Sequence, residues 1–243
     1  MGVDYNHAAN LHTIEGPLAA LPKLFPEGMP ASILDVGCGT GTWLRAAFDL
    51  GVTDIFGIDG VDIPPENLLF DANRFKRYDL TAPIDLGRRF EVVLCLEVAE
   101  HLQAEFAQVI IETLTKHSDR IVFSAAIPVL QGGQHHVNCQ WPEYWQGLFN
   151  RRGFVCEDSL RSRIWNDQQI ELWYRQNIFL ACHDSDAGKE PRIRSLIHPE
   201  MYSVTAAHTA ISGIESGRIP VPLKWYLKSA TKAILRKTRW HLS

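Results

Sequence analysis

Short runs of apolar and β-branched residues alternate with longer segments of helical period between residues 31 and 184. This alternation is typical of βαβ units, whose parallel strands share one sheet. It predicts an α/β fold with a Rossmann-like, doubly wound, seven-stranded and mostly parallel sheet. The predicted strands are Ser32–Val36, Asp54–Ile58, Phe75–Asp79, Glu91–Leu96, Arg120–Ala125, Phe154–Leu160 and Glu171–Cys182.

Helical period is strongest in three segments, Gly41–Leu50, Ala104–His117 and Pro142–Arg152. Gly51 and Gly153 follow the first and the last of them, as glycines commonly do at helix ends. We therefore expect helices at these three places between the predicted strands.

Proline and charge patterns divide the chain into three predicted parts. Residues 1–30 form a helical lead-in expected to cover the ligand site, residues 31–184 form the α/β domain, and residues 185–243 form a C-terminal extension. Of 243 residues, 46% are apolar and 21% are charged, which is typical of a globular protein rather than a disordered one.

Charge is distributed unevenly along the chain. The net charge is −4, but the last 20 residues hold six basic and no acidic side chains, which leaves −10 for the first 223. A body this acidic disfavours binding along a nucleic-acid backbone, which needs a positively charged surface. We therefore expect a small-molecule acceptor rather than a nucleic acid as the partner of the α/β domain.

Basic residues recur at every fourth position from Lys224 to Arg236, opposite an apolar face, which predicts a basic amphipathic helix over Leu223–Arg239. Such a helix either contacts an anionic membrane surface or docks on the acidic body.

No window approaches 18 uninterrupted apolar residues, and the five scattered cysteines form no CxxC pair. The expected location is the cytoplasm, with peripheral contact at the inner face of the membrane if the helix binds lipid.

A glycine-rich turn, Gly37-Cys38-Gly39-Thr40-Gly41, follows the first predicted strand and opens the next helix. A dinucleotide-binding loop would need its third glycine at position 42, where this chain has Thr42. Asp59 and Asp79 close the next two predicted strands, where a carboxylate can accept ribose hydroxyls. The alternative is a turn that serves only close packing of strand and helix.

Asp35-Val36-Gly37-Cys38-Gly39-Thr40-Gly41 resembles the first motif of the class I S-adenosylmethionine-dependent methyltransferases, and the resemblance spans about residues 31–184. It implies that the glycine loop holds the methionine part of the cofactor, that Asp59 holds the ribose and that Asp79 and Leu80 meet the adenine. The implied cofactor-binding residues are Asp35, Gly37, Cys38, Gly39, Asp59, Gly60, Asp79, Leu80 and Leu96.

Glu97, Glu100 and His101 follow the fourth predicted strand, and His136 lies in a polar loop after the fifth. This pattern is similar to the divalent-metal site of small-RNA 2′-O-methyltransferases, and its first part resembles ubiquinone-pathway O-methyltransferases. The resemblance implies Glu97, Glu100, His101 and His136 as ligands of Mg²⁺, Mn²⁺ or Zn²⁺. Without a metal, His101 or His136 is the candidate general base. A third interpretation gives these side chains only local contacts.

Three segments are similar to bacterial methyltransferases encoded among sugar and glycan pathways: His12–Pro17, the loop around His136, and Trp173–Asn177. We therefore expect methyl transfer to a hydroxyl of a small polar acceptor, a sugar or glycan intermediate. The alternatives are transfer to nitrogen or to a phenolic oxygen, and a cofactor-binding scaffold without activity. Metal-assisted methylation of RNA is a weaker alternative, because the body is acidic.

Overall fold

The computed structural model describes residues 13–128 and 135–202. The chain forms two compact units, Met1–His198 and Pro199–Ser243. His12 and the predicted helix Leu223–Arg239 lie outside the described residues, and the predicted three-part division of the chain stays a prediction. Within the described ranges, no helix combines the length and the apolar character needed to cross a membrane.

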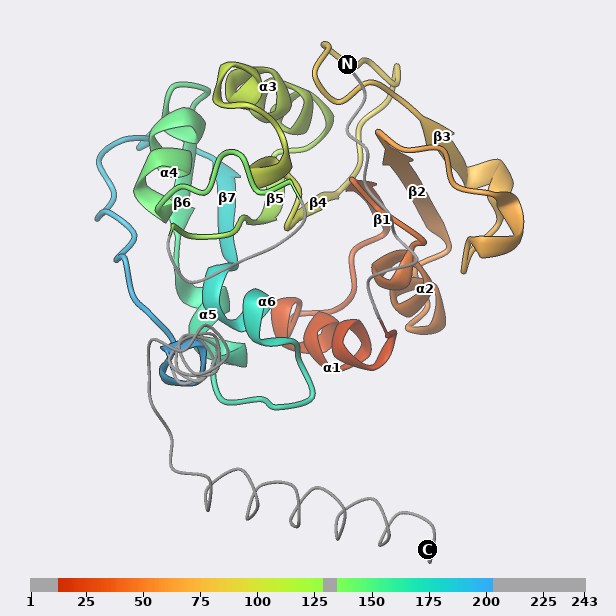
Figure 1. Ribbon diagram of the computed structural model, residues 1–243, viewed down its shortest axis with the longest axis horizontal. Coiled ribbons are helices and arrows are strands. Elements are labelled where there is room, and N and C mark those ends of the chain that lie inside the picture. Colours follow the sequence, from red (N-terminus) through yellow and green to blue (C-terminus); the bar gives the residue numbers. More distant parts are fainter. Residues whose placement is uncertain (1–12, 129–134, 203–243) are drawn as a thin grey trace, which may run out of the picture. The chain divides into compact units, whose positions relative to one another are not determined.

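A single sheet of seven strands organises the first unit, in the order β3-β2-β1-β4-β5-β7-β6 (Figure 1). The first five strands in that order run parallel, whereas β7 is antiparallel to both β5 and β6. The predicted α/β class and the mostly parallel seven-stranded sheet are therefore confirmed. The strands are β1 Ser32–Val36, β2 Asp54–Asp59, β3 Phe75–Arg77, β4 Val92–Leu96, β5 Arg120–Ser124, β6 Phe154–Glu157 and β7 Phe179–His183.

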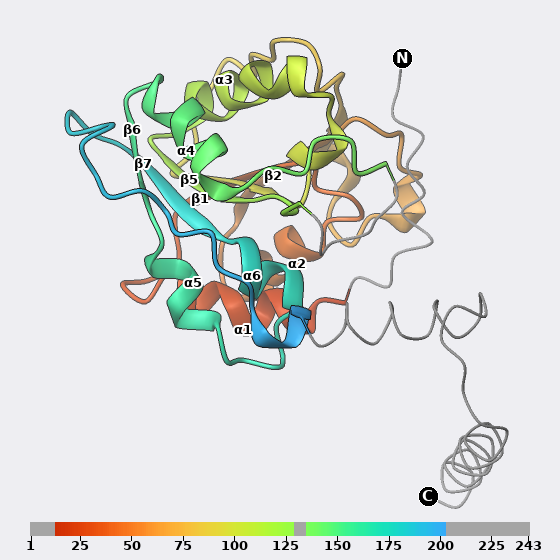
Figure 2. The ribbon, with the colours of Figure 1, turned by 60° about the vertical axis from the view of Figure 1, so that its left-hand side comes forward.

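Helices cover both faces of the sheet (Figure 2). One buried apolar cluster joins the sheet to α3 and α4, and a second joins its other face to α1, α2, α5 and α6. Because both faces are covered, a central strand such as β4 is apolar and buried throughout. The α-helices are α1 Glu15–Leu24, α2 Thr42–Asp49, α3 Ala107–His117, α4 Pro142–Asn150, α5 Ser159–Ile164 and α6 Leu172–Asn177.

Short 3₁₀ turns complete the secondary structure. They are η2 Pro65–Asn67, η3 Ala72–Arg74, η4 Ala99–His101 and η5 Ala104–Phe106. The predicted helix Ala104–His117 therefore consists of η5 followed by α3. The turn η4 is separated from the end of β4 by two residues and carries two of the predicted site residues, Glu100 and His101.

Two predicted strands were wrong in part. The first half of Glu171–Cys182 is helix α6, and only its last residues belong to β7. The aromatic residues of this segment favour a strand, but Tyr174 and Ile178, four residues apart, are both buried in the same cluster. Similarly, Phe154–Leu160 stops being a strand at Glu157, because Leu160 packs into the core from α5. In both segments, packing in the folded protein overrides local strand propensity.

The order of the strands fixes where a ligand can bind. β1 lies between β2 and β4, so the chain turns to opposite sides after β1 and after β4. In open α/β sheets, this switch point leaves a crevice beyond the carboxyl ends of the strands. The predicted cofactor residues follow β1, β2, β3 and β4, so the fold gathers them at this edge.

Candidate functional site

The glycine loop between β1 and α2 requires glycine at specific positions. Gly37, Gly39 and Gly41 have φ angles of 80°, 53° and 86°, which side chains with a β-carbon rarely adopt. A Cβ on Gly37 would lie 2.4 Å from Val98, and a Cβ on Gly41 would lie 2.3 Å from Phe70. Both the backbone conformation and the close neighbours therefore explain the spacing of these glycines.

Asp59, at the end of β2, holds the glycine loop in place. Its Oδ2 accepts a hydrogen bond from the backbone amide of Gly39 at 2.8 Å, and its Oδ1 accepts one from the amide of Val61 at 2.8 Å. The sequence predicts Asp59 only as a ligand-binding carboxylate, and this second contribution is apparent only in the structure. Each carboxylate oxygen has a second lone pair, so a ligand hydroxyl can still be accepted.

A cavity of about 280 Å³ lies at the carboxyl ends of β1, β2 and β4. Side chains that the sequence did not assign to the cofactor also line it, among them Thr42, Trp43, Arg77 and Tyr174. The structure thus brings every predicted cofactor residue to one place, while the contact assigned to each of them stays a prediction. The predicted residues that line the cavity are Asp35, Gly37, Cys38, Gly39, Asp59, Gly60, Asp79, Leu80 and Leu96.

Carboxyl groups dominate the electrostatics of this cavity. Asp35, Asp59, Asp79 and Glu97 line it, against a single guanidinium, that of Arg77, among its described lining residues. Burial, and then the charge of Asp59, raise the pKa of Asp35 to about 8. The hydroxyl and amide of Thr81 lower the pKa of Asp79. Even with Asp35 protonated, the three other acidic side chains outnumber the one guanidinium, so this charge pattern suits a cationic ligand better than the pyrophosphate of a dinucleotide.

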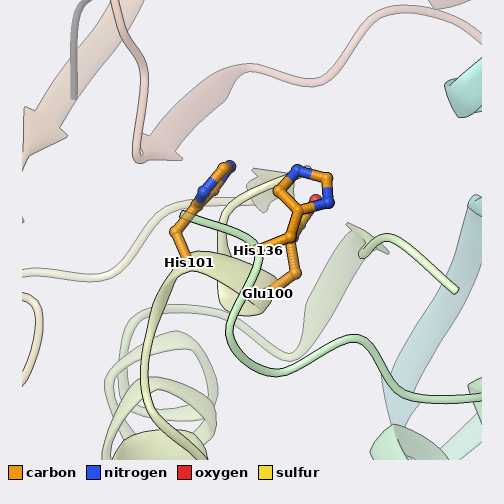
Figure 3. Close-up of side chains that lie close together, drawn as sticks. All are labelled: Glu100, His101 and His136. Atoms are coloured by element: carbon orange, nitrogen blue, oxygen red, sulfur yellow. The ribbon is translucent and has the colours of Figure 1, made fainter. Parts of the chain in front are cut away.

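Three of the predicted acid and imidazole residues, Glu100, His101 and His136, lie close together (Figure 3), and His101 lines the cavity. Glu100 and His101 belong to η4, and His136 belongs to the loop that precedes α4. The backbone oxygen of Glu100 accepts hydrogen bonds from the amides of Val137 at 2.9 Å and Asn138 at 3.0 Å. These two bonds fix the loop against η4, and the imidazole rings of His101 and His136 lie 4.9 Å apart.

Glu100, His101 and His136 each offer one ligand atom within 4.8 Å of the other two. Neither carboxylate oxygen of the fully buried Glu100 has a partner with full hydrogen-bond geometry among the described residues. Burial, followed by the charge of Glu97, raises its pKa, although the backbone amides of Glu100 and Ala126 offset part of the rise. A divalent cation would compensate such a buried carboxylate, so the donor set fits a metal.

The fourth predicted ligand, Glu97, is held differently. It lies outside this group of three, and its Oε1 accepts a hydrogen bond from Nδ2 of Asn177 at 2.9 Å. Glu97 and His101 line the cavity. The cluster therefore contacts the cavity through these two side chains.

Sequence reasoning missed the contribution of α6 to the site. Tyr174 lines the cavity and packs edge-to-face against Trp43, with ring centroids 5.0 Å apart. Burial raises the pKa of its phenol, so the hydroxyl stays protonated at neutral pH. The one signal in the sequence is the segment Trp173–Asn177, which lies within the predicted strand Glu171–Cys182.

Comparison with known proteins places these features in context. The model of a family described as "Methyltransferase domain" matches residues 8–159, more than half of the chain. A curated relative, ribosomal RNA large subunit methyltransferase E from Caulobacter sp. (strain K31), is 42% identical over 43 residues. That match covers 18% of each chain, so this protein spans less than a fifth of its curated relative.

Solved structures resemble the fold. Magnesium protoporphyrin IX methyltransferase (ChlM) from Synechocystis PCC 6803, solved with bound SAH, has 18% identity and a TM-score of 0.51, covering 70% of this chain and 83% of its own. The methyltransferase domain of bacterial CtHen1-C has 13% identity and a TM-score of 0.50, covering 70% of this chain and 98% of its own. At these identities the likeness is one of fold.

Proposed function

Because the chain belongs to the methyltransferase-domain family, we propose that it transfers a methyl group from S-adenosylmethionine to a hydroxyl of a small polar acceptor, a sugar or glycan-pathway intermediate. The predictions of a class I methyltransferase and of its enzyme class are confirmed by the family match and the fold. The observation that carries the proposal is the acidic cavity, which the glycine loop closes at the switch point of the sheet.

The residues of the cavity fit S-adenosylmethionine. This cofactor carries a sulfonium, an ammonium and one carboxylate, so its net positive charge matches the acidic lining. The Gly37 and Gly39 segment would hold its methionine part, Asp59 and Gly60 its ribose, and Asp79 with Leu80 its adenine. When bound, its sulfonium supplies an electrophilic methyl group. The protein positions the acceptor and removes a proton.

His101 and His136 are the candidates for proton removal. His101 lines the cavity, and the ring of His136, from the loop that precedes α4, packs against the ring of His101. An imidazole has an ordinary pKa of about 6.5, which suits a general base at neutral pH. We assign the acceptor hydroxyl to the side of the cavity that His101 and Glu97 form.

A second candidate mechanism adds a divalent cation, and the buried carboxylate of Glu100 favours it. Glu100, His101 and His136 would hold Mg²⁺, Mn²⁺ or Zn²⁺, with Glu97 as the further predicted ligand. A cation held there would lower the pKa of an acceptor hydroxyl that coordinates it. The imidazoles would then act as ligands rather than as bases.

An assay with methyl-labelled S-adenosylmethionine tests the proposal. The acceptor panel contains nucleotide sugars and oligosaccharides, with catechols, primary amines and a short RNA for comparison. We expect label on a hydroxylated carbohydrate and, for the metal-free mechanism, full activity in excess chelator. His101→Ala or His136→Ala should then lower the rate by about 10²- to 10⁴-fold. His183→Ala, which changes a histidine outside the cavity, is the matched control.

The assay separates the alternatives. Loss of activity in chelator, restored by one of the three cations, selects the metal-assisted mechanism. Label only on amines, catechols or RNA would contradict the proposed acceptor class. Less than a tenfold loss in both histidine variants, together with full activity in chelator, would contradict both mechanisms.

A further inference from the structure

Glu97 has an unusual backbone conformation at an informative place. It follows β4 directly, and its φ of 56° lies in the left-handed region, which costs a residue with a β-carbon about 1 kcal/mol or more. Its amide donates to the backbone oxygen of Ser124 at 3.0 Å, which joins it to the end of β5. Such strain persists where surrounding contacts impose it, and its carboxylate lines the cavity.

Asn177 makes one of those contacts from a distant part of the chain. It is the last residue of α6, it is 3% exposed, and its Nδ2 donates to Oε1 of Glu97 at 2.9 Å. Three residues earlier on the same helix, Tyr174 lines the cavity and packs on Trp43. A single turn of α6 therefore holds both an aromatic wall of the cavity and the Glu97 carboxylate.

The charge around Glu97 explains why a donor is needed there. Glu100 lies close to Glu97, so the two carboxyl groups repel each other when both are ionised. An amide N–H can only donate, so the contact with Asn177 stabilises Glu97 as a hydrogen-bond acceptor and as an anion. Removal of this donor would therefore weaken the hold on the Glu97 carboxylate at the cavity.

The location of Glu97 indicates which part of the ligand it faces. His101, the candidate base that lines the cavity, lies four residues further along the same connection between β4 and α3. The acceptor hydroxyl must reach both this base and the methyl group, so the sulfonium has to lie at the same side of the cavity. If the proposed function holds, the Glu97 carboxylate would lie on the side of the cavity that takes the sulfur, the one ligand atom whose charge changes during the reaction.

We propose that Asn177 is a positioning residue that holds the Glu97 carboxylate beside the reacting sulfur, where it favours the cationic sulfonium over the neutral thioether product. This inference rests on the proposed function. Asn177 and Glu97 together would make the cavity prefer a ligand with a positive charge at the sulfur position. This preference would assist the replacement of the neutral product by new cofactor. Neither the fold nor the family match implies this specificity.

Calorimetry with two probes measures this specificity without turnover. S-adenosylhomocysteine is neutral at sulfur, whereas sinefungin carries an amino group, cationic at neutral pH, in place of the methyl sulfonium. Titrations in chelator exclude any contribution from a bound cation. We expect the wild-type protein to bind sinefungin at least about tenfold more tightly, because opposite charges attract strongly in a partly buried site.

Two variants separate the contribution of the Asn177 donor from that of the Glu97 charge. Asn177→Ala removes the donor and keeps the charge, whereas Glu97→Gln removes the charge and keeps an oxygen that can accept from Asn177. Both should lower the preference for sinefungin by at least about threefold, with the affinity for S-adenosylhomocysteine within about twofold of wild type. Asn67→Ala, on the exposed turn η2, is the matched control for loss of an amide.

The possible results lead to different conclusions. An unchanged preference in Glu97→Gln or in Asn177→Ala overturns the proposal. An equal loss of affinity for both probes in Asn177→Ala shows a merely structural contact and also overturns it. Wild-type protein that binds neither probe overturns the proposed cofactor together with this inference, whereas equal binding of both overturns this inference alone.

Discussion

Asp35, the last residue but one of β1, is a buried acid that lines the candidate cofactor cavity. Its side chain is 2% exposed, and the charged group that acts on its pKa is another acid, Asp59. Burial first, and Asp59 second, raise its pKa from an ordinary 3.8 to about 8. In the ligand-free protein Asp35 therefore holds its proton at neutral pH.

This shift predicts how stability depends on pH. Between about pH 4 and pH 8 the folded state keeps a proton that the unfolded chain has released, so the free energy of unfolding falls as pH rises through this range. Asp35→Asn carries no charge and should lose this dependence, a difference of up to about 6 kcal/mol above pH 8. Urea unfolding of ligand-free protein at pH 5, 7 and 8.5 measures it.

Asp62→Asn, an exposed aspartate just after β2, is the control and should follow the wild-type pH dependence. If the wild-type and Asp35→Asn curves run parallel between pH 5 and 8.5, Asp35 is ionised in the folded protein, and the account of the cavity's electrostatics is wrong.

At the scale of elements, the segment after β7 is attached to the domain through Glu190. Its Oε1 accepts hydrogen bonds from Nδ2 of Asn150 at 2.6 Å, from Nε2 of Gln146 at 2.9 Å and from the amide of Cys156 at 3.2 Å. Burial raises the pKa of Glu190, but these donors outweigh it and lower the pKa to about 2. The Glu190 carboxylate therefore connects the segment after β7 to α4 and β6.

Glu190→Gln should weaken this junction. The substitution removes the charge that strengthens these three hydrogen bonds and a fourth, from the amide of Gly188 to Oε2 at 2.7 Å, so we expect the free energy of unfolding at pH 7 to fall by about 1–3 kcal/mol. Because the folded-state pKa is depressed, this contribution is present above about pH 4.5 and is lost as pH falls toward 2. Denaturant unfolding at pH 7 and pH 3 measures both effects.

Glu66→Gln, on an exposed turn, is the matched control and should leave stability within about 0.5 kcal/mol of wild type. A Glu190→Gln protein as stable as this control at pH 7 would show that Glu190 does not hold the segment.

The elements that sequence predicts well are those with a local physical signature. A central parallel strand such as β4 is a continuous apolar run, and the glycine loop needs the residue types that stand at Gly37 and Gly41, because no side chain fits there. Helix α6 has no such signature, since four consecutive residues, Tyr174 to Asn177, are all buried and leave no amphipathic period. The bond between Asn177 and Glu97 joins residues 80 positions apart, so no local pattern predicts it.

At the scale of the whole first unit, the site depends on strand order rather than on any one segment. Residues from Asp35 to Tyr174 meet in one cavity because β1 separates β2 from β4. The spacing of Asp59 and Asp79 predicted this meeting, because both follow neighbouring parallel strands. The acidic character of the assembled lining could be recognised only once the cavity was located.

Calorimetric titration of the ligand-free protein with S-adenosylhomocysteine tests the central claim most directly, because every part of the proposed function depends on this cavity binding the cofactor. We expect one site per chain, and Asp59→Ala should weaken binding by about 10- to 100-fold, since it removes a ribose acceptor and the anchor of the Gly39 amide. Asp62→Asn should bind like wild type. Absence of binding by the wild-type protein, or binding of NAD instead, would contradict the account.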